Sequence, residues 1–506
     1  MKIYIIAPAV AYEADTLVTD AVLNIEGRFA VMASAAVTTV AALFSGAFEL
    51  RLCDEQIEDV DFDDPSDIVA ISINVAQAQR GIEIARAFKE RGKTVILGGP
   101  HVSLSPETFE GMADCMVIGE FETIAAEVTR DLVDGKLKPR YQGTQADLAE
   151  APIPRWDLYP NDRAVTGVIQ TSRGCPFECN FCDVIQYLGR KQRHKPVPKV
   201  VEEAQVLYDH GYRTISLSDD NFTVNRKKSR ALLEGLAAWN GRDGRQPVQF
   251  STQASIDLAR DGELVAMCSE AGLREIFVGI ETSDEAALVE SQKRQNLRRD
   301  LVADASAIVS GGVVLLSGMM VGFDSDGLDC FERQLAFGMA LPVVNIRVTV
   351  LVAPVATPLF DQMRHDGRLV GDGKMALLPG AGLLTNIIPK NMTRLQLAEG
   401  ARWLVCELYD PDNAISRFER VASILKAPAE HLVPTSGKAA LGTGSAGILT
   451  LIRESARDPG AGRVIEAVSE LSKKRPEISR DLTNMLAMYL NTYRSIERAG
   501  QSERVL

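Results

Sequence analysis

Three cysteines within eight residues constrain this chain more than any other feature. Cys175, Cys179 and Cys182 are spaced Cys-x3-Cys-x2-Cys and follow an apolar run, residues 165–170, that predicts a short strand. Thiolates on one tight loop can converge on a single metal centre, and a closed zinc or iron–sulfur site takes four protein ligands. Because no fourth cysteine is near in sequence, the loop predicts a centre with one open position. The open iron of a [4Fe–4S] cluster is such a position, and it can chelate a small molecule.

A structural zinc loop is the alternative, with His194 as the fourth ligand. The spacing makes this the weaker interpretation, and the strand-end pattern further along the chain weakens it again. The other cysteines stand singly in apolar or helical contexts and are typical of reduced cytoplasmic thiols: Cys53, Cys115, Cys268, Cys330 and Cys406.

The cysteine spacing, with Phe181 before the third cysteine, resembles the signature of the radical S-adenosylmethionine (SAM) enzymes. The resemblance implies that the three cysteines hold a [4Fe–4S] cluster whose open iron binds the amino and carboxylate groups of SAM. It implies that the reduced cluster cleaves SAM to a 5′-deoxyadenosyl radical, while the protein positions the reactants. It also implies an electron donor such as flavodoxin or ferredoxin, and a packing contact of Phe181 with adenine.

Length and charge exclude several other classes of function. A chain of 506 residues is too long for one core, and its net charge of −13 argues against a nucleic-acid partner. No apolar run reaches the roughly 18 residues of a membrane span. The first residues predict a strand and not a signal peptide. We expect a cytoplasmic protein without a transmembrane segment.

Residues 1–140 alternate strand and helix signals, which predicts an α/β domain with a doubly wound parallel sheet of the Rossmann type. Its first helix is expected over residues 30–43, which are rich in small side chains. In such a domain the ligand crevice lies at the carboxyl ends of the strands. The order of elements resembles the cobalamin-binding domain in front of many radical SAM enzymes. The strand-end residues that the resemblance places against cobalamin are Ser72, Gly98, Gly99, Gly119 and Glu120.

One departure from the cobalamin domain matters. The usual domain carries Asp-x-His-x-x-Gly after its second strand, and the histidine ligates cobalt from below. Here residues 54–59 are Asp-Glu-Gln-Ile-Glu-Asp, without the histidine and the glycine. Cobalamin would therefore bind without a histidine ligand, as is usual in the radical SAM branch, and a domain that has lost the cofactor is the alternative.

Residues 141–164 predict an extended linker with three prolines in its centre, and we expect Trp156 and Tyr159 to anchor it across the domain seam. Residues 165–385 again alternate strand and helix signals, as a partial (β/α) TIM barrel requires. Polar residues or glycines follow each expected strand, on the face where such barrels place their active sites. The resemblance assigns SAM contacts to Asp219, Asp220, Asn221, Gln253, Ser255, Glu281, Gly318 and Gly322.

Residues 386–506 predict a helical C-terminal domain that could cover the barrel mouth. Thr393 is the expected cap of a helix over residues 394–409, and residues 437–447 form a glycine-rich hinge. The pattern Pro-Lys-x-Met…Leu-x-Glu-Gly…Leu-Tyr-Asp-Pro over residues 389–411 resembles the hopanoid C-2 methylase group of cobalamin-dependent radical SAM enzymes. Ala356 replaces a glycine common in the superfamily, so its loop receives no role.

The resulting hypothesis is a cobalamin-dependent radical SAM methyltransferase that methylates an unactivated carbon of a hydrophobic or natural-product small molecule. A lipid or terpenoid is favoured, while peptides, tetrapyrroles and antibiotic scaffolds stay open. The first alternative is a radical SAM enzyme that cyclises, oxidises or couples carbons, with cobalamin redox-only or lost. The second is a non-catalytic, cluster-bearing sensor, which has no need for the SAM-binding strand ends.

Overall fold

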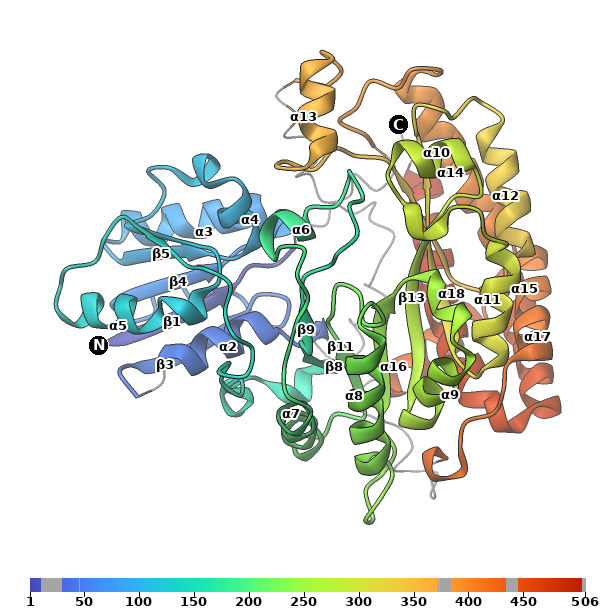
Figure 1. Ribbon diagram of the computed structural model, residues 1–506, viewed down its shortest axis with the longest axis horizontal. Helices are drawn as coiled ribbons and strands as arrows, with labels where there is room; N and C mark the ends of the chain where they lie inside the picture. Colours follow the sequence, from blue (N-terminus) through green and yellow to red (C-terminus); the bar gives the residue numbers. More distant parts are fainter. Residues whose placement is uncertain (11–29, 45, 372, 374–383, 434–444, 503–506) are drawn as a thin grey trace.

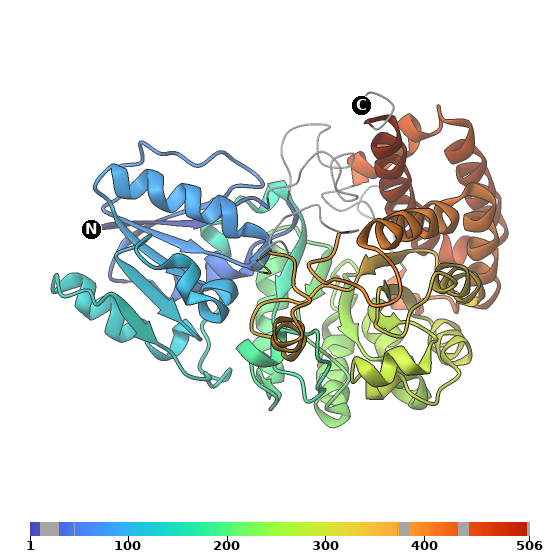
Figure 2. The same ribbon diagram turned by 90° about the horizontal axis from the view of Figure 1, so that it is seen from above.

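The chain forms three side-by-side bodies in the computed structural model (Figures 1 and 2): an N-terminal sheet with helices on both faces, a central curved sheet with outer helices, and a C-terminal group of helices. This order confirms the α/β fold class. The structure describes residues 1–10, 30–44, 46–371, 373, 384–433 and 445–502.

The N-terminal sheet has six parallel strands in the order β3-β1-β4-β5-β6-β7. Alternate residues of β4 (Ile68–Ser72) enter two different cores, since Ile68 and Ala70 belong to one and Val69 and Ile71 to the other. An unbroken apolar run is needed because both faces of the strand are buried. The other elements are β1 (Lys2–Ala7), α2 (Ala35–Phe44), β3 (Glu49–Asp54), α3 (Ala78–Glu90), β5 (Thr94–Gly98), α4 (Pro100–Leu104), β6 (Cys115–Ile118), α5 (Ala125–Val133) and β7 (Arg140–Gln142).

The central sheet has seven parallel strands in the order β15-β14-β13-β12-β11-β8-β2. In the described part of the chain its edge strands do not pair with each other, so the barrel is partial, as predicted. Its elements after the linker are β8 (Ala164–Ile169), α7 (Val197–Asp209), β11 (Thr214–Leu217), α8 (Arg226–Trp239), β12 (Gln249–Ala254), α9 (Gly262–Ala271), β13 (Leu273–Glu281), α10 (Glu285–Glu290), α11 (Leu301–Ser310), β14 (Val314–Val321), α12 (Cys330–Ala340) and β15 (Ile346–Val350).

The strand β2 (Ala30–Met32) corrects the sequence-based expectation of one helix over residues 30–43. The helix begins only at Ala35, and β2 pairs with β8 through Ala30↔Ala164 and Met32↔Thr166. A three-residue strand carries no periodic signal, and it forms here because the barrel sheet offers it a free edge. The N-terminal part of the chain therefore contributes one strand to the barrel.

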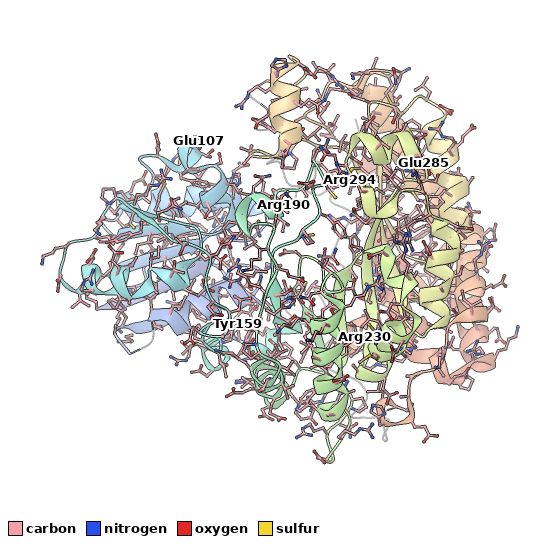
Figure 3. The ribbon with its side chains drawn as sticks, viewed as in Figure 1. Glu107, Tyr159, Arg190, Arg230, Glu285 and Arg294 are labelled. Atoms are coloured by element: carbon pink, nitrogen blue, oxygen red, sulfur yellow. The ribbon has the colours of Figure 1, made fainter. Side chains whose placement is uncertain are left out.

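The segment between β7 and β8 crosses between the two sheets. Trp156 and Tyr159 are buried in the core of the barrel. The Tyr159 hydroxyl donates a 2.7 Å hydrogen bond to Asp54 Oδ2, at the end of a strand of the N-terminal sheet. Figure 3 shows Tyr159 at the seam between the two sheets.

The C-terminal helices lie on the flank and at the far end of the barrel. Asp481 of α18 pairs with Arg274, and Asn484 donates to Gln249 at 3.1 Å. Both partners stand at the amino ends of their strands, so α18 lies at the end of the barrel opposite the mouth. At the other end, α13 (Pro358–His365) packs on the loop of the three cysteines, where Leu359 N donates to the Asn180 carbonyl at 3.0 Å. The C-terminal elements are α14 (Arg394–Tyr409), α15 (Pro411–Ile424), α16 (Ser445–Ser455), α17 (Pro459–Lys474) and α18 (Ser479–Ser502).

The predicted cap of α14 is confirmed as a complete capping box. Thr393 Oγ1 accepts from Gln396 N at 3.1 Å, and Gln396 Oε1 accepts from Thr393 N at 2.8 Å. Most of the predicted glycine hinge at 437–447 lies outside the described residues. No helix in the described ranges is long and apolar enough to cross a membrane.

Candidate functional site

The three cysteines lie on an excursion from the carboxyl end of β8. Two short strands, β9 (Ser172–Arg173) and β10 (Arg193–His194), pair antiparallel and close the base of this loop. Gly174 has φ 95°, and a Cβ there would stand 2.8 Å from the Lys191 carbonyl and 2.9 Å from that of Gly189. The tight return of the chain therefore requires glycine directly before Cys175.

The thiols are shielded from solvent and are near one another. Cys179 is buried, while Cys175 and Cys182 are partly buried. Burial raises the pKa of Cys175 and raises that of Cys182 to about 12, and the neighbouring thiols add to both effects. Thiols in such surroundings ionise when a metal centre binds them.

Within the described ranges no three or more His, Cys, Asp or Glu side chains converge as ligands of a single metal ion. A cubane cluster bonds each thiolate to a different iron, so its three cysteine ligands do not have to converge on one point. The loop is therefore compatible with a [4Fe–4S] cluster.

Asp219 and Asp220, after β11, bind the start of the cysteine loop. Asp219 Oδ1 accepts from Thr171 N at 2.8 Å and from Ser172 N at 2.6 Å, and its Oδ2 accepts from the Thr171 hydroxyl. Burial raises the pKa of Asp219 to about 6, against these hydrogen bonds. Asp220 Oδ2 accepts from Gly174 N at 2.8 Å. The carboxylates hold the loop, and a contact of either with SAM stays a prediction.

Asn221 offers an acceptor beside the cysteines. Its Nδ2 donates to Ser255 Oγ at 2.5 Å, and its side chain also hydrogen-bonds to Cys175. The buried Oδ1 of Asn221 has no hydrogen-bond partner among the described residues. An unused amide oxygen suits a donor such as an amino group. Gln253, on the next strand end, is exposed at the mouth.

Glu281 ends β13 in the left-handed region, with φ 65° and a bulge in the pairing with β14. Its Oε1 lies 2.7 Å from Lys293 Nζ, and the side chains are 9% and 12% exposed. Burial lowers the pKa of Lys293, but Glu281 and the thiols of Cys179 and Cys182 together hold it above its usual value. The ammonium lies 5.8 Å from the centre of the Phe181 ring.

Lys293 was missed by the sequence reading. It stands in Ser-Gln-Lys-Arg-Gln-Asn, residues 291–296, a polar stretch without periodicity after a short helix. In the structure this stretch packs on the cysteine loop. Asn180 N donates to the Ser291 carbonyl at 3.1 Å, and Gln295 Nε2 donates to Cys179 Sγ at 3.7 Å.

The two glycines of β14 have different surroundings. A Cβ on Gly318 would lie 3.0 Å from Phe277 Cζ and 3.6 Å from Glu281 Oε2, so this glycine keeps space beside Glu281. Gly322 has φ 99°, and its Cβ would lie 2.9 Å from Leu397 of α14. Gly322 therefore serves the packing of α14, and its predicted contact with adenine stays a prediction.

Two of the glycines predicted to contact cobalamin are required by close backbone packing within the N-terminal domain. Gly99 has φ 103°, and its Cβ would lie 2.7 Å from the backbone N and O of Ile73. Gly119 has φ 79°, and its Cβ would lie 2.5 Å from the Gly143 carbonyl. Gly98 and Ser72 are partly buried on the same strand ends. Glu120 is turned toward two arginines of the cysteine loop.

A cavity of about 200 Å³ lies at these strand ends. One wall is α6 (Val184–Tyr187), which follows Cys182 directly, and the other walls come from the loops after β5, β6 and β7. Its lining is polar and rich in amides and hydroxyls: Ser103, Gln142, Thr144, Gln145, Gln186 and Tyr187. Figure 3 places Arg190, which follows α6 in the chain, at the seam between the two sheets.

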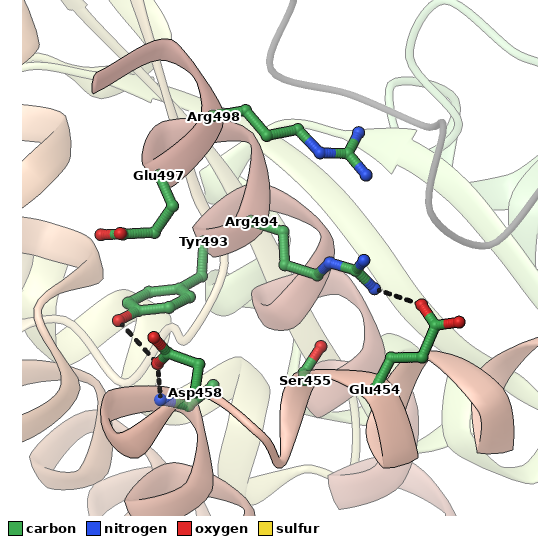
Figure 4. A pocket seen from close by; sticks show the side chains of 8 residues that line it. Glu454, Ser455, Asp458, Tyr493, Arg494, Glu497 and Arg498 are labelled. Carbon is green, nitrogen blue, oxygen red and sulfur yellow. Dashed lines mark hydrogen bonds and ion pairs between the residues drawn. The ribbon is translucent and has the colours of Figure 1, made fainter. Parts of the chain in front are cut away.

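A second cavity, of about 190 Å³, lies among the C-terminal helices (Figure 4). Its charged and polar groups pair with one another, since Arg494 binds Glu454 and Tyr493 binds Asp458, each at 3.1 Å. It contains none of the residues predicted for the site. We assign no chemistry to it.

Comparison with known proteins agrees with this geometry. Residues 169–327 match the model of the radical SAM superfamily, and residues 357–452 match a domain of unknown function, DUF4070. An uncharacterized methyltransferase of Synechocystis sp. is 30% identical over 412 residues, 80% of this chain and 76% of that protein. The hopanoid C-2 methylase of Rhodopseudomonas palustris is 31% identical over 341 residues, 66% of this chain and 64% of the methylase.

The fold is shared with solved structures. The radical SAM methyltransferase TsrM from Kitasatospora setae, with cobalamin and a [4Fe–4S] cluster bound, matches with a TM-score of 0.63. The match covers 95% of this chain and 99% of TsrM at 15% identity. The three bodies therefore follow a known arrangement of the fold.

Proposed function

This chain belongs to the radical SAM superfamily, in the branch with a cobalamin-type domain ahead of the barrel, and from this premise we propose a cobalamin-dependent C-methyltransferase. The observation that carries the proposal is the set of groups around the cysteine loop. An unused Asn221 oxygen lies on one side, the Glu281–Lys293 pair lies on the other, and the carboxyl ends of the N-terminal sheet face the loop through α6.

The chain's own residues would hold and orient SAM on the cluster. Asn221 Oδ1 accepts from the amino group, and Lys293 donates to the carboxylate, since each group matches the chemistry of its partner. Glu281 keeps Lys293 charged and leaves its other oxygen, beside Gly318, for a ribose hydroxyl. The bound groups supply the chemistry: a 5′-deoxyadenosyl radical from SAM at the cluster, and a methyl group from cobalamin.

The polar groups at the N-terminal strand ends match the groups on the rim of cobalamin. The corrin ring is rimmed by amide side chains, and the 200 Å³ cavity presents amides and hydroxyls. The loop after β3 offers no histidine, and Asp54 is engaged by the Tyr159 hydroxyl. Cobalamin would therefore bind without a histidine ligand from this loop.

The inner face of the barrel favours a substrate with a hydrophobic body. Phe277 of β13 and Leu316 of β14 pair in register and are partly buried. They share the inner face with Gly318, because a Cβ on Gly318 would touch Phe277. The likeness to a hopanoid methylase supports a small lipid or terpenoid substrate.

Anaerobic reconstitution with iron, sulfide and cobalamin tests the proposal. We expect one cluster and one cobalamin per chain, 5′-deoxyadenosine from SAM and reductant, and a product heavier by one methylene group in extract from a deletion strain. A cobalt-free enzyme that still converts substrate would overturn methylation in favour of other radical chemistry. A cluster that yields no 5′-deoxyadenosine would favour the sensor. Cys175→Ala should lose the cluster. Cys406→Ala, at an exposed cysteine outside the loop, is its matched control.

A further inference from the structure

Glu120 and Glu122, directly after β6, bind two arginines of the cysteine loop. Glu120 Oε2 lies 2.6 Å from Arg173 Nη1, and Glu120 Oε1 lies 2.5 Å from Arg193 Nη2. Glu122 Oε1 lies 2.6 Å from Arg173 Nη2. The N-terminal domain and the cysteine loop thus share a buried ionic cluster.

Both oxygens of Glu120 are in use. Oε2 also accepts from Arg193 Nη1 at 2.9 Å and from Ala146 N at 3.1 Å, and the side chain is 3% exposed. Burial alone would raise the pKa of Glu120, but the bonds from Arg193 and Arg173 hold it below its usual value. Protein donors therefore occupy both oxygens of this carboxylate. Neither oxygen is free for the predicted contact of Glu120 with cobalamin.

The position of the arginines connects this cluster of charges to the cysteines. Arg173 and Arg193 face each other in the β9–β10 pairing that closes the base of the loop. Arg173 stands two residues before Cys175. Glu120 therefore holds both strands of the hairpin from which the three cysteines project.

We propose that Glu120 is a positioning residue for the iron–sulfur cluster, through which the N-terminal domain fixes the cysteine loop and sets the reduction potential of the cluster. The inference rests on the proposed function, because it assumes a cluster on the three cysteines. The four side chains carry two negative and two positive charges and are together neutral. Cluster potentials respond to nearby charge and to hydrogen bonding.

The sign of the expected shift follows from this charge balance. Glu120→Gln leaves Arg173 and Arg193 opposite Glu122 alone, so the excess positive charge moves the midpoint potential of the cluster to more positive values. Arg193→Gln leaves an excess negative charge and moves the potential to more negative values. A loop that was merely loosened would shift in the same direction in both variants. The double variant is again neutral and returns toward the wild-type potential.

The experiment is a dye-mediated titration of the full-length reconstituted protein, followed by electron paramagnetic resonance, with iron, sulfide and cobalamin content measured on the same samples. Glu127→Gln is the matched control, since Glu127 forms an exposed pair with Lys138 on the same domain. We expect opposite shifts in the two single variants, unchanged cobalamin binding in Glu120→Gln and no shift in the control.

Two results would overturn the inference: an unshifted potential in Glu120→Gln, or shifts of the same sign in both single variants. If Glu120→Gln loses cobalamin while the cluster potential is unshifted, Glu120 contacts cobalamin and does not position the cluster. A wild-type protein that takes up no cluster would instead refute the proposed function, so the two failures are distinguishable. Should Glu120→Gln fail to fold, Arg193→Gln compared with the neutral double variant still gives the sign of the effect.

Discussion

Lys293 Nζ lies 2.7 Å from Glu281 Oε1, although twelve residues and a helix separate the two in the chain. The left-handed backbone of Glu281 turns its carboxylate toward the lysine, and Gly279 leaves room for the pair. A Cβ on Gly279 would stand 2.8 Å from Lys293 Nζ and close to Glu281 Oε1. The pair places one cation beside the cysteine loop.

Replacing Lys293 by methionine should raise KM for SAM at least tenfold. A charge-assisted hydrogen bond to a carboxylate contributes roughly 1.5–3 kcal/mol, and about 1.4 kcal/mol corresponds to a factor of ten. The measurement is 5′-deoxyadenosine formation against SAM concentration. Lys293→Met leaves the buried Glu281 carboxylate without its cation. The double variant Lys293→Met/Glu281→Gln removes both charges and is measured beside it. Lys473→Met, on the exposed surface, is the control. An unchanged KM in both variants would exclude Lys293 as the carboxylate ligand.

Asp219→Asn should destabilise the protein and lower its iron content far more than Asp220→Asn. Asp219 accepts from three donors of Thr171 and Ser172, and an amide can no longer accept on both of its atoms. A buried donor left unpaired costs about 1–3 kcal/mol. Asp220 accepts from one backbone donor, which an asparagine oxygen still satisfies. Chemical denaturation and iron analysis measure the two effects, and equal losses would contradict this account.

Gly99→Ala should cost more stability than Gly92→Ala. Both glycines have positive φ, 103° and 72°, but a Cβ on Gly99 meets the Ile73 backbone at 2.7 Å and one on Gly92 meets nothing within 4 Å. The Gly92 variant isolates the left-handed backbone strain, about 1 kcal/mol. Gly99→Ala must also displace backbone atoms, for a total of about 3 kcal/mol. Similar unfolding free energies of the two variants would mean that the backbone at residue 99 can move away from Ile73 without cost.

Glu275 should make the protein less stable as the pH rises. Burial, and then the charge of Asp481, raises the pKa of Glu275 to about 7 from the ordinary 4.5. A pKa raised in the folded state gives stability that is present below pH 4.5 and is lost as the pH rises through 7. Because Glu275 is partly exposed, we expect about 2 kcal/mol, less than the full shift implies.

The corresponding variant is Glu275→Gln, which cannot ionise. It should flatten the loss of unfolding free energy between pH 5 and pH 8 in denaturant titrations, and it should be the more stable protein at pH 8. Glu263→Gln, at an exposed glutamate of α9, is the control. An unchanged slope in Glu275→Gln would place the titrating group elsewhere.

Much of the architecture was readable from local pattern. The cysteine spacing, the apolar run of β4 and the cap at Thr393 are signals within a few residues, and the structure contains the loop, the buried strand and the capping box that they predict. The strand β2 was misread as helix because three residues carry no period, and their partners in β8 lie 134 residues away. The C-terminal helices were recognised, but the place of α18 at the amino ends of the strands depends on contacts such as Arg274 with Asp481.

The sequence by itself determined which thiols are proposed as cluster ligands, because the spacing of three cysteines on one short loop is a local property of the chain. Only the tertiary structure decided which other groups meet them. Lys293 reaches the cysteines because a bulge and a glycine on β13 leave it space, and Glu120 meets Arg173 because two separately built sheets present their carboxyl ends to each other. Charges that pair across such distances leave no periodicity in the chain, since the contact depends on the positions of whole domains.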